Sequence, residues 1–119
     1  MRRLFKATGF GAQIHAGDLV AVKTHFGEQG GTAFVQPHWL IPLVDILRKA
    51  GAHPFLTDTN TLYSGQRQDA ASHSMLAAMH GFDPLRIGAP VFIADGLKSH
   101  NQISVPGIGP HFEHCYLAG

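Results

Sequence analysis

Acidic, amide and basic side chains follow an apolar stretch in the segment LTDTNTLYSGQR, residues 56–67. Asp58 and Asn60 stand just past the apolar residues, and Tyr63 and Arg67 come a few positions later. Carboxylate and amide oxygens accept protons or bind cations, whereas a guanidinium group binds anions. The alternative is structural, because Asp and Asn after a strand also cap the next helix or close an Asx turn.

Two other apolar stretches also end in groups that can do chemistry. Lys23 closes the run LVAVK, and a lysine among buried neighbours needs a carboxylate or ligand partner unless its ammonium reaches solvent. His25 and Glu28 follow, and imidazole with carboxylate suits either a first-row metal or proton transfer, although both residues are also ordinary loop residues. Asp95 follows the third run, VFIA.

Short β-branched runs alternate with helix-period segments, a pattern typical of strand, helix, strand units around a parallel sheet. We therefore expect a three-layer α/β/α fold with a mainly parallel sheet of about three strands, two crossover helices and a C-terminal β-hairpin. The expected strands are 19–24, 53–58 and 91–93, and the expected helices are 37–51 and 68–81.

The 119 residues predict one α/β domain, because 45% hydrophobic and 14% charged residues are enough for a core. Residues 1–16 are expected to form an N-terminal helix or arm, and residues 99–117 the appended hairpin. Parallel strands place their carboxyl ends at one edge of the sheet, where ligands bind in open α/β folds. The polar residues after the three strands are therefore predicted to converge on one rim.

Composition argues against several classes of protein. A formal charge of +1 without a dense basic run makes a nucleic-acid partner unexpected. The N-terminus lacks a signal-peptide core and no run has membrane-spanning length, so a cytoplasmic protein without a membrane partner is expected. The single cysteine, Cys115, cannot alone hold a cluster. Most of the nine histidines are expected at the surface, and no pair has HExxH spacing.

Three blocks in order, VKTHFGEQGGTAFVQP, GAHPFLTDTNTLYSGQR and GAPVFIADGL, resemble domain-of-unknown-function family 362, whose members are described as iron-sulfur cluster-binding or ferredoxin-fused proteins. The resemblance implies a cytoplasmic prokaryotic protein in which an α/β domain precedes a ferredoxin-like segment with four-iron clusters on CxxCxxC-type cysteines. It also implies that the site lies in four motifs: HFGE at 25–28, TDTNTLY at 57–63, Gly65 with Arg67, and ADGL at 94–97.

The chain departs from that family by lacking the cluster cysteines, so we expect a partial or short member, with any 4Fe-4S cluster in a missing C-terminal segment. An open sheet edge predicts a homo-oligomer or an iron-sulfur domain as partner. Two functions follow. In the first, Lys23 and Arg67 hold a small anionic ligand, while His25, Glu28 and Asp58 bind a divalent metal or move protons. The alternative is a non-catalytic assembly domain, and whether the chain is an enzyme stays open.

Overall fold

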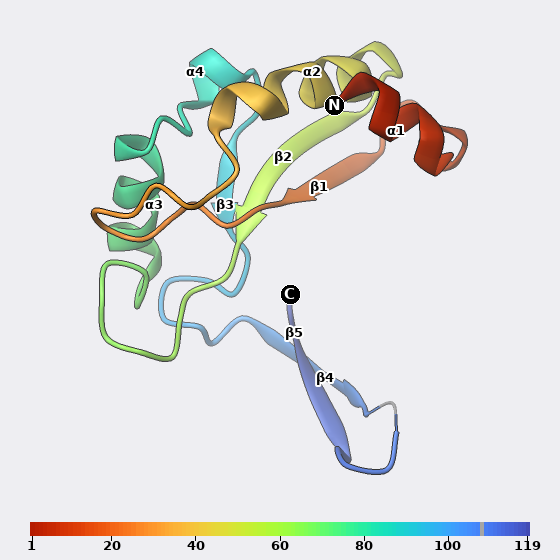
Figure 1. Ribbon diagram of the computed structural model, residues 1–119. Coiled ribbons are helices and arrows are strands. Elements are labelled where there is room, and N and C mark those ends of the chain that lie inside the picture. Colours follow the sequence, from red (N-terminus) through yellow and green to blue (C-terminus); the bar gives the residue numbers. More distant parts are fainter. Residues whose placement is uncertain (108) are drawn as a thin grey trace.

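The computed structural model describes residues 1–107 and 109–119 as a helix-covered sheet from which a hairpin projects (Figure 1). The N-terminal region holds α1 (Arg2–Thr8) and a 3-10 helix, η1 (Phe10–Gln13). The remaining elements, in chain order, are β1 (Leu19–Lys23), α2 (Pro37–Lys49), β2 (His53–Asp58), α3 (Ala70–Met79), α4 (Pro84–Ile87), β3 (Val91–Ile93), β4 (Gln102–Pro106) and β5 (His114–Ala118).

The three strands β1, β2 and β3 form a parallel sheet in that order, which confirms the predicted α/β class. Lys23 at the end of β1 pairs with Thr57 of β2, and Asp58 at the end of β2 pairs with Ile93 at the end of β3. All three strands therefore finish at the same edge, and the chain enters its polar loops there.

The helices lie over one face of the sheet, where they enclose the core. Leu40 and Val44 of α2, Leu56 of β2 and Ala77 of α3 are buried in one cluster. Because the strand order runs in one direction, right-handed crossovers place both connections on the same face. The described residues thus build one helical layer on the sheet, without the second helical layer expected from the sequence and without a reversal of strand order.

The opposite face of the sheet is open. Leu19 is 79% exposed and Phe92 56% exposed on this face, and Phe55 lies half-buried between them. Together with Ala21 and Lys23 they line a hollow of about 790 Å³. Apolar strand residues normally pack against a second layer, so this face is an unusual apolar surface for a free chain.

Local sequence explains where the two main helices begin. Pro37 starts α2, a position where its missing N–H costs nothing, and Pro42 is tolerated one turn later. Asp69 caps α3, because its carboxylate accepts hydrogen bonds from the backbone N–H and the hydroxyl of Ser72. Gly81 follows α3 with a φ of 87°, in the left-handed region that favours glycine.

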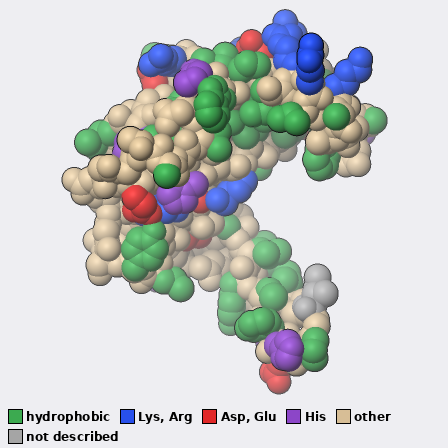
Figure 2. Space-filling view, in the orientation of Figure 1, with side chains coloured by type: hydrophobic (Ala, Val, Ile, Leu, Met, Phe, Trp, Pro, Cys, Tyr) green, Lys and Arg blue, Asp and Glu red, His purple; other side chains and the backbone are tan. Residues whose placement is uncertain are grey.

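The C-terminal hairpin is confirmed, but it forms a sheet of its own instead of extending the parallel sheet. β4 and β5 are antiparallel, with Gln102 opposite Ala118. Asn101 joins the hairpin to the body, since its N–H donates to the carbonyl of Asp95 and its own carbonyl accepts from Gly119. Figure 2 shows a wide notch between the hairpin and the body, with hydrophobic side chains gathered on the hairpin.

None of the helices in the described part of the chain combines the length and the apolar character needed to cross a bilayer.

Candidate functional site

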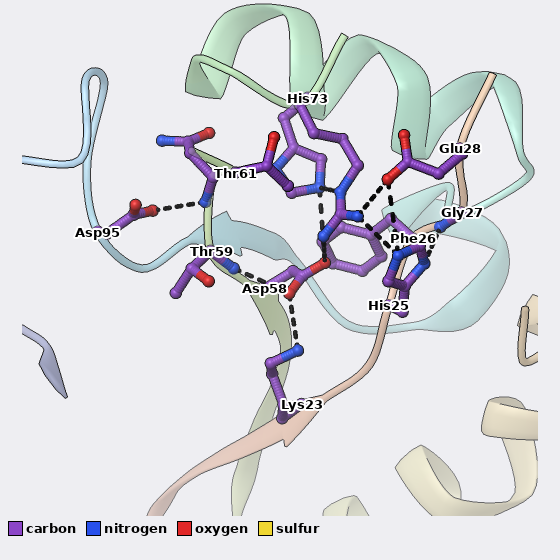
Figure 3. A network of polar contacts seen from close by, with 12 residues as sticks. Lys23, His25, Phe26, Gly27, Glu28, Asp58, Thr59, Thr61, His73 and Asp95 are labelled. Carbon is purple, nitrogen blue, oxygen red and sulfur yellow. Dashed lines mark hydrogen bonds and ion pairs between the residues drawn. The ribbon is translucent and has the colours of Figure 1, made fainter. Parts of the chain in front are cut away.

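Asp58, the last residue of β2, is the centre of a polar network at the carboxyl edge of the sheet (Figure 3). Its side chain is 2% exposed. Oδ1 accepts from Lys23 Nζ at 2.7 Å and from the Thr59 N–H at 2.9 Å, and Oδ2 accepts from Arg67 Nη2 at 2.9 Å. Burial opposes ionisation, but the hydrogen bonds from Lys23 and Thr59 outweigh it and hold the pKa of this carboxyl below its ordinary 3.8.

Arg67 connects this carboxylate to the loop that follows β1. The loop after β2 folds back on itself, with the Thr61 N–H donating to the Arg67 carbonyl, and the guanidinium points inward with 6% exposure. Its Nη1 donates to Glu28 Oε1 at 2.5 Å. Burial lowers the pKa of Arg67, but the hydrogen bond with Glu28 and the charges of Asp58 and Glu28 raise it above its ordinary value. The guanidinium thus bridges two carboxylates.

Glu28 is the exposed carboxylate of the network. Its side chain is 43% exposed, and Oε1 accepts from the Tyr63 hydroxyl as well as from Arg67. Those two hydrogen bonds, that from Tyr63 being the larger effect, lower the pKa of Glu28. The same contact raises the pKa of Tyr63 above its ordinary 10.0, because a phenolate would lose its acceptor and face a carboxylate.

The glycine-rich loop is held by Gly27, whose φ of 93° suits glycine. A Cβ at this position would lie 2.6 Å from His80 Nδ1 and 2.7 Å from the Phe34 ring. His80 in turn contacts the Phe26 carbonyl through Nδ1 at 2.7 Å, and its ring stacks on Phe34 with centroids 4.7 Å apart. Close packing against α3 therefore fixes the backbone that presents Glu28.

His25 lies beside Glu28 at the rim, with a side chain that is 48% exposed. Its Nδ1 is 2.8 Å from the Gly27 N–H, and its Nε2 is 2.6 Å from Arg67 Nη1 and 3.8 Å from Glu28 Oε1. Gly27 and Arg67 both offer donors, and a neutral imidazole has one acceptor nitrogen, so only one of these two contacts is a hydrogen bond. Of the residues expected to move protons, His25 is accessible, whereas Asp58 is enclosed by donors.

His73 belongs to this network, although it was not among the residues predicted for the site. The ring is fully buried on α3, contrary to the surface position expected for most histidines. Its Nε2 is 3.2 Å from Arg67 Nε and 3.6 Å from Asp58 Oδ2. Because Arg67 is a donor, Nε2 accepts and the proton sits on Nδ1, which is buried without a partner in the described structure. Burial is the main cause that lowers the pKa of His73 below its ordinary 6.5.

Asn60 and Asp95, also predicted for the site, form a second small cluster between the ends of β2 and β3. Asp95 is buried, and its Oδ1 accepts from the Asn60 N–H at 3.0 Å. The Asn60 side chain donates to the Gly96 carbonyl at 2.8 Å. These contacts tie two loops together. Among the described residues, no hydrogen bond joins this pair to Arg67, so the structure assigns them a local backbone role.

The candidate metal ligands do not surround a common point. Glu28 and Asp58 contact different nitrogens of Arg67, so the guanidinium lies where a cation would have to sit. The described residues contain no group of three or more His, Cys, Asp or Glu side chains arranged to hold a metal ion. The residues present also do not fit an iron-sulfur cluster, because Cys115 on β5 is the sole cysteine of the sequence.

A family model described as a domain of unknown function, DUF362, matches residues 20–119. The match contains the whole polar network and both β-hairpin strands. No curated protein and no solved structure matched the chain.

Proposed function

Because this chain belongs to the DUF362 family, we propose that it is the α/β module of an iron-sulfur cluster-binding redox protein and that it binds a small anionic ligand at the carboxyl ends of its strands. The redox part of this proposal comes from the family resemblance. Any four-iron cluster would be held by cysteines of a partner segment, since Cys115 cannot hold one alone.

The main observation in support of ligand binding is that two cationic side chains lie together at the carboxyl edge of the sheet. Lys23 arrives from the end of β1 and Arg67 from the loop after β2, and both contact Asp58. The Lys23 side chain is 63% exposed, and an ammonium group has three donors, of which Asp58 takes one. The remaining donors face solvent at the edge of the sheet where α/β proteins bind ligands.

Buried ion networks also occur in proteins for structural reasons alone, so the test must distinguish a ligand-binding site from a structural ion network. The wild-type protein is heated in phosphate, acetate or chloride at one ionic strength. A ligand that binds the folded state raises the melting temperature, and Lys23→Gln should abolish the increase. Lys98→Gln is the matched control, because Lys98 is similarly exposed at 68% and contacts a different carboxylate, Asp69. Equal melting temperatures in all three salts would contradict the proposal.

A second candidate function, a non-catalytic assembly domain, is favoured by the open face of the sheet. We propose that two copies pack these faces together, since Leu19 and Phe92 are exposed on a surface that otherwise resembles a core. Light scattering at micromolar concentration should report a homo-oligomer for the wild type and a monomer for Phe92→Ser. Met75→Ser is the control, because Met75 is 64% exposed on α3. A monomeric wild type would exclude this candidate.

A further inference from the structure

We propose that the Glu28 side chain occupies the position of the ligand's own carboxylate, and that the ligand is a small carboxylate which displaces Glu28 from Arg67 and Tyr63. This inference rests on the proposed function and names its ligand class. It also makes Glu28 an internal competitor of the ligand, whereas the sequence predicted a metal ligand or catalytic group.

The donors around Glu28 have the arrangement of a carboxylate-binding site. Arg67 Nη1 and the Tyr63 hydroxyl both donate to Oε1, and these two groups are themselves 3.4 Å apart. His25 Nε2 lies 3.8 Å from the same oxygen. Arg67 is 6% exposed and its Nη2 is held by Asp58, so the Nη1 group that contacts Glu28 is fixed in place before a ligand arrives.

Only one of the two carboxylates on Arg67 can be replaced. Asp58 is 2% exposed, accepts three hydrogen bonds and sits at the end of a central strand. Glu28 is 43% exposed and belongs to a glycine-rich turn, closed by a hydrogen bond from the Gly31 N–H to the Glu28 carbonyl. Its side chain can turn into solvent without disturbing the core.

Charge favours a singly charged carboxylate in that position. The cations of Lys23 and Arg67 balance the carboxylates of Asp58 and Glu28, so the network is neutral as it stands. When Glu28 turns away, one positive charge is left beside a buried guanidinium, and one carboxylate from outside restores the balance. A phosphate dianion would overcompensate it, whereas a carboxylate can accept from Arg67 Nη1 and from the Tyr63 hydroxyl as Glu28 does.

The experiment measures acetate binding by ¹⁵N NMR, with acetate replacing chloride at constant ionic strength, for the wild type and for Glu28→Gln and Glu28→Ala. Removing a half-exposed internal ion pair should tighten acetate binding about fivefold in Glu28→Ala. Glu28→Gln should fall between the wild type and Glu28→Ala, because the amide still accepts hydrogen bonds without the charge. Glu113→Ala, the other glutamate in the sequence, is the control and should leave the affinity unchanged.

Tyr63→Phe, placed in the Glu28→Ala protein, supplies a second test because Tyr63 is 55% exposed and its ring need not move. It should weaken acetate binding again by removing one of the two donors. Equal or weaker binding by Glu28→Ala than by the wild type, or a preference for phosphate over acetate, would overturn the inference. If the wild type still shows Lys23-dependent stabilisation by anions, the proposed function survives that result. If no anion binds any of these proteins, both fail.

Discussion

Replacing Asp58 by Asn tests whether the buried carboxylate holds the strand-end network together. The substitution keeps the size of the side chain and removes its charge. One oxygen of Asp58 accepts from Lys23 and Thr59 and the other from Arg67. Whichever way the amide is oriented, its NH₂ group therefore faces at least one donor, and Arg67 loses the more buried of its two counterions.

The size of the effect follows from the exposure of the partners. Removing one member of a buried ion pair costs about 3–5 kcal/mol, because the other charge is left without compensation. Lys23 is well hydrated and contributes little to this loss, while Arg67 keeps its contact with Glu28. We therefore expect the lower end of that range, a decrease of about 3 kcal/mol in the free energy of unfolding.

Urea unfolding of the wild type and Asp58→Asn at pH 7 measures this decrease. Asp45→Asn is the matched control, since Asp45 is exposed on α2, and it should change stability by less than about 0.5 kcal/mol. A decrease below about 1 kcal/mol in Asp58→Asn, with an unchanged denaturant slope, would refute the claim that Asp58 organises the network.

Two further substitutions test the elements around the site. Burial lowers the pKa of His73 in the folded state, so its contribution to stability is fully present above the ordinary pKa of 6.5 and is lost as the pH falls below it, by at most about 1.4 kcal/mol per pH unit. Urea titrations at pH 7.5 and 5.5 should therefore show a smaller loss of stability in His73→Gln than in the wild type. An equal loss in both proteins would contradict this. Gly27→Ala places a side chain at a strained φ and against His80 and Phe34, so it should lower the free energy of unfolding by about 2–3 kcal/mol. Gly30→Ala is the control, because its φ is equally unfavourable but its surroundings are open, and it should cost about 1 kcal/mol. Equal decreases for the two variants in urea unfolding would contradict this.

The sequence predicts the fold well where one local signal decides it. The strand HPFLTD is found at His53–Asp58 and helix α2 begins at Pro37, both as predicted. The number of helical layers was harder to predict, because the periodicity along the chain is the same on whichever side of a strand the next parallel strand is added. The structure runs β1, β2, β3 in one direction and leaves Phe92 on an open face, which no pattern within a single strand reveals.

The site was likewise predicted only in part, because positions along the chain do not fix which side chains meet in space. The parallel strands bring Lys23 and Asp58 together, as the common strand edge predicts. Asn60 and Asp95 stand in equivalent sequence positions, yet they serve the neighbouring loops. His73 was missed, although a signal exists: it lies three and four residues before the buried Leu76 and Ala77 on α3, which places it on the inner stripe of the helix.

The most direct test of the central claim is the NMR signal of the Arg67 side-chain Nε–H during an acetate titration of the wild-type protein at constant ionic strength. If the strand-end network is a ligand site, this signal shifts and saturates with acetate, and the shift is lost in Lys23→Gln. An Arg67 signal that stays in place while acetate replaces chloride would show that the guanidinium serves only to bridge Asp58 and Glu28 within the fold.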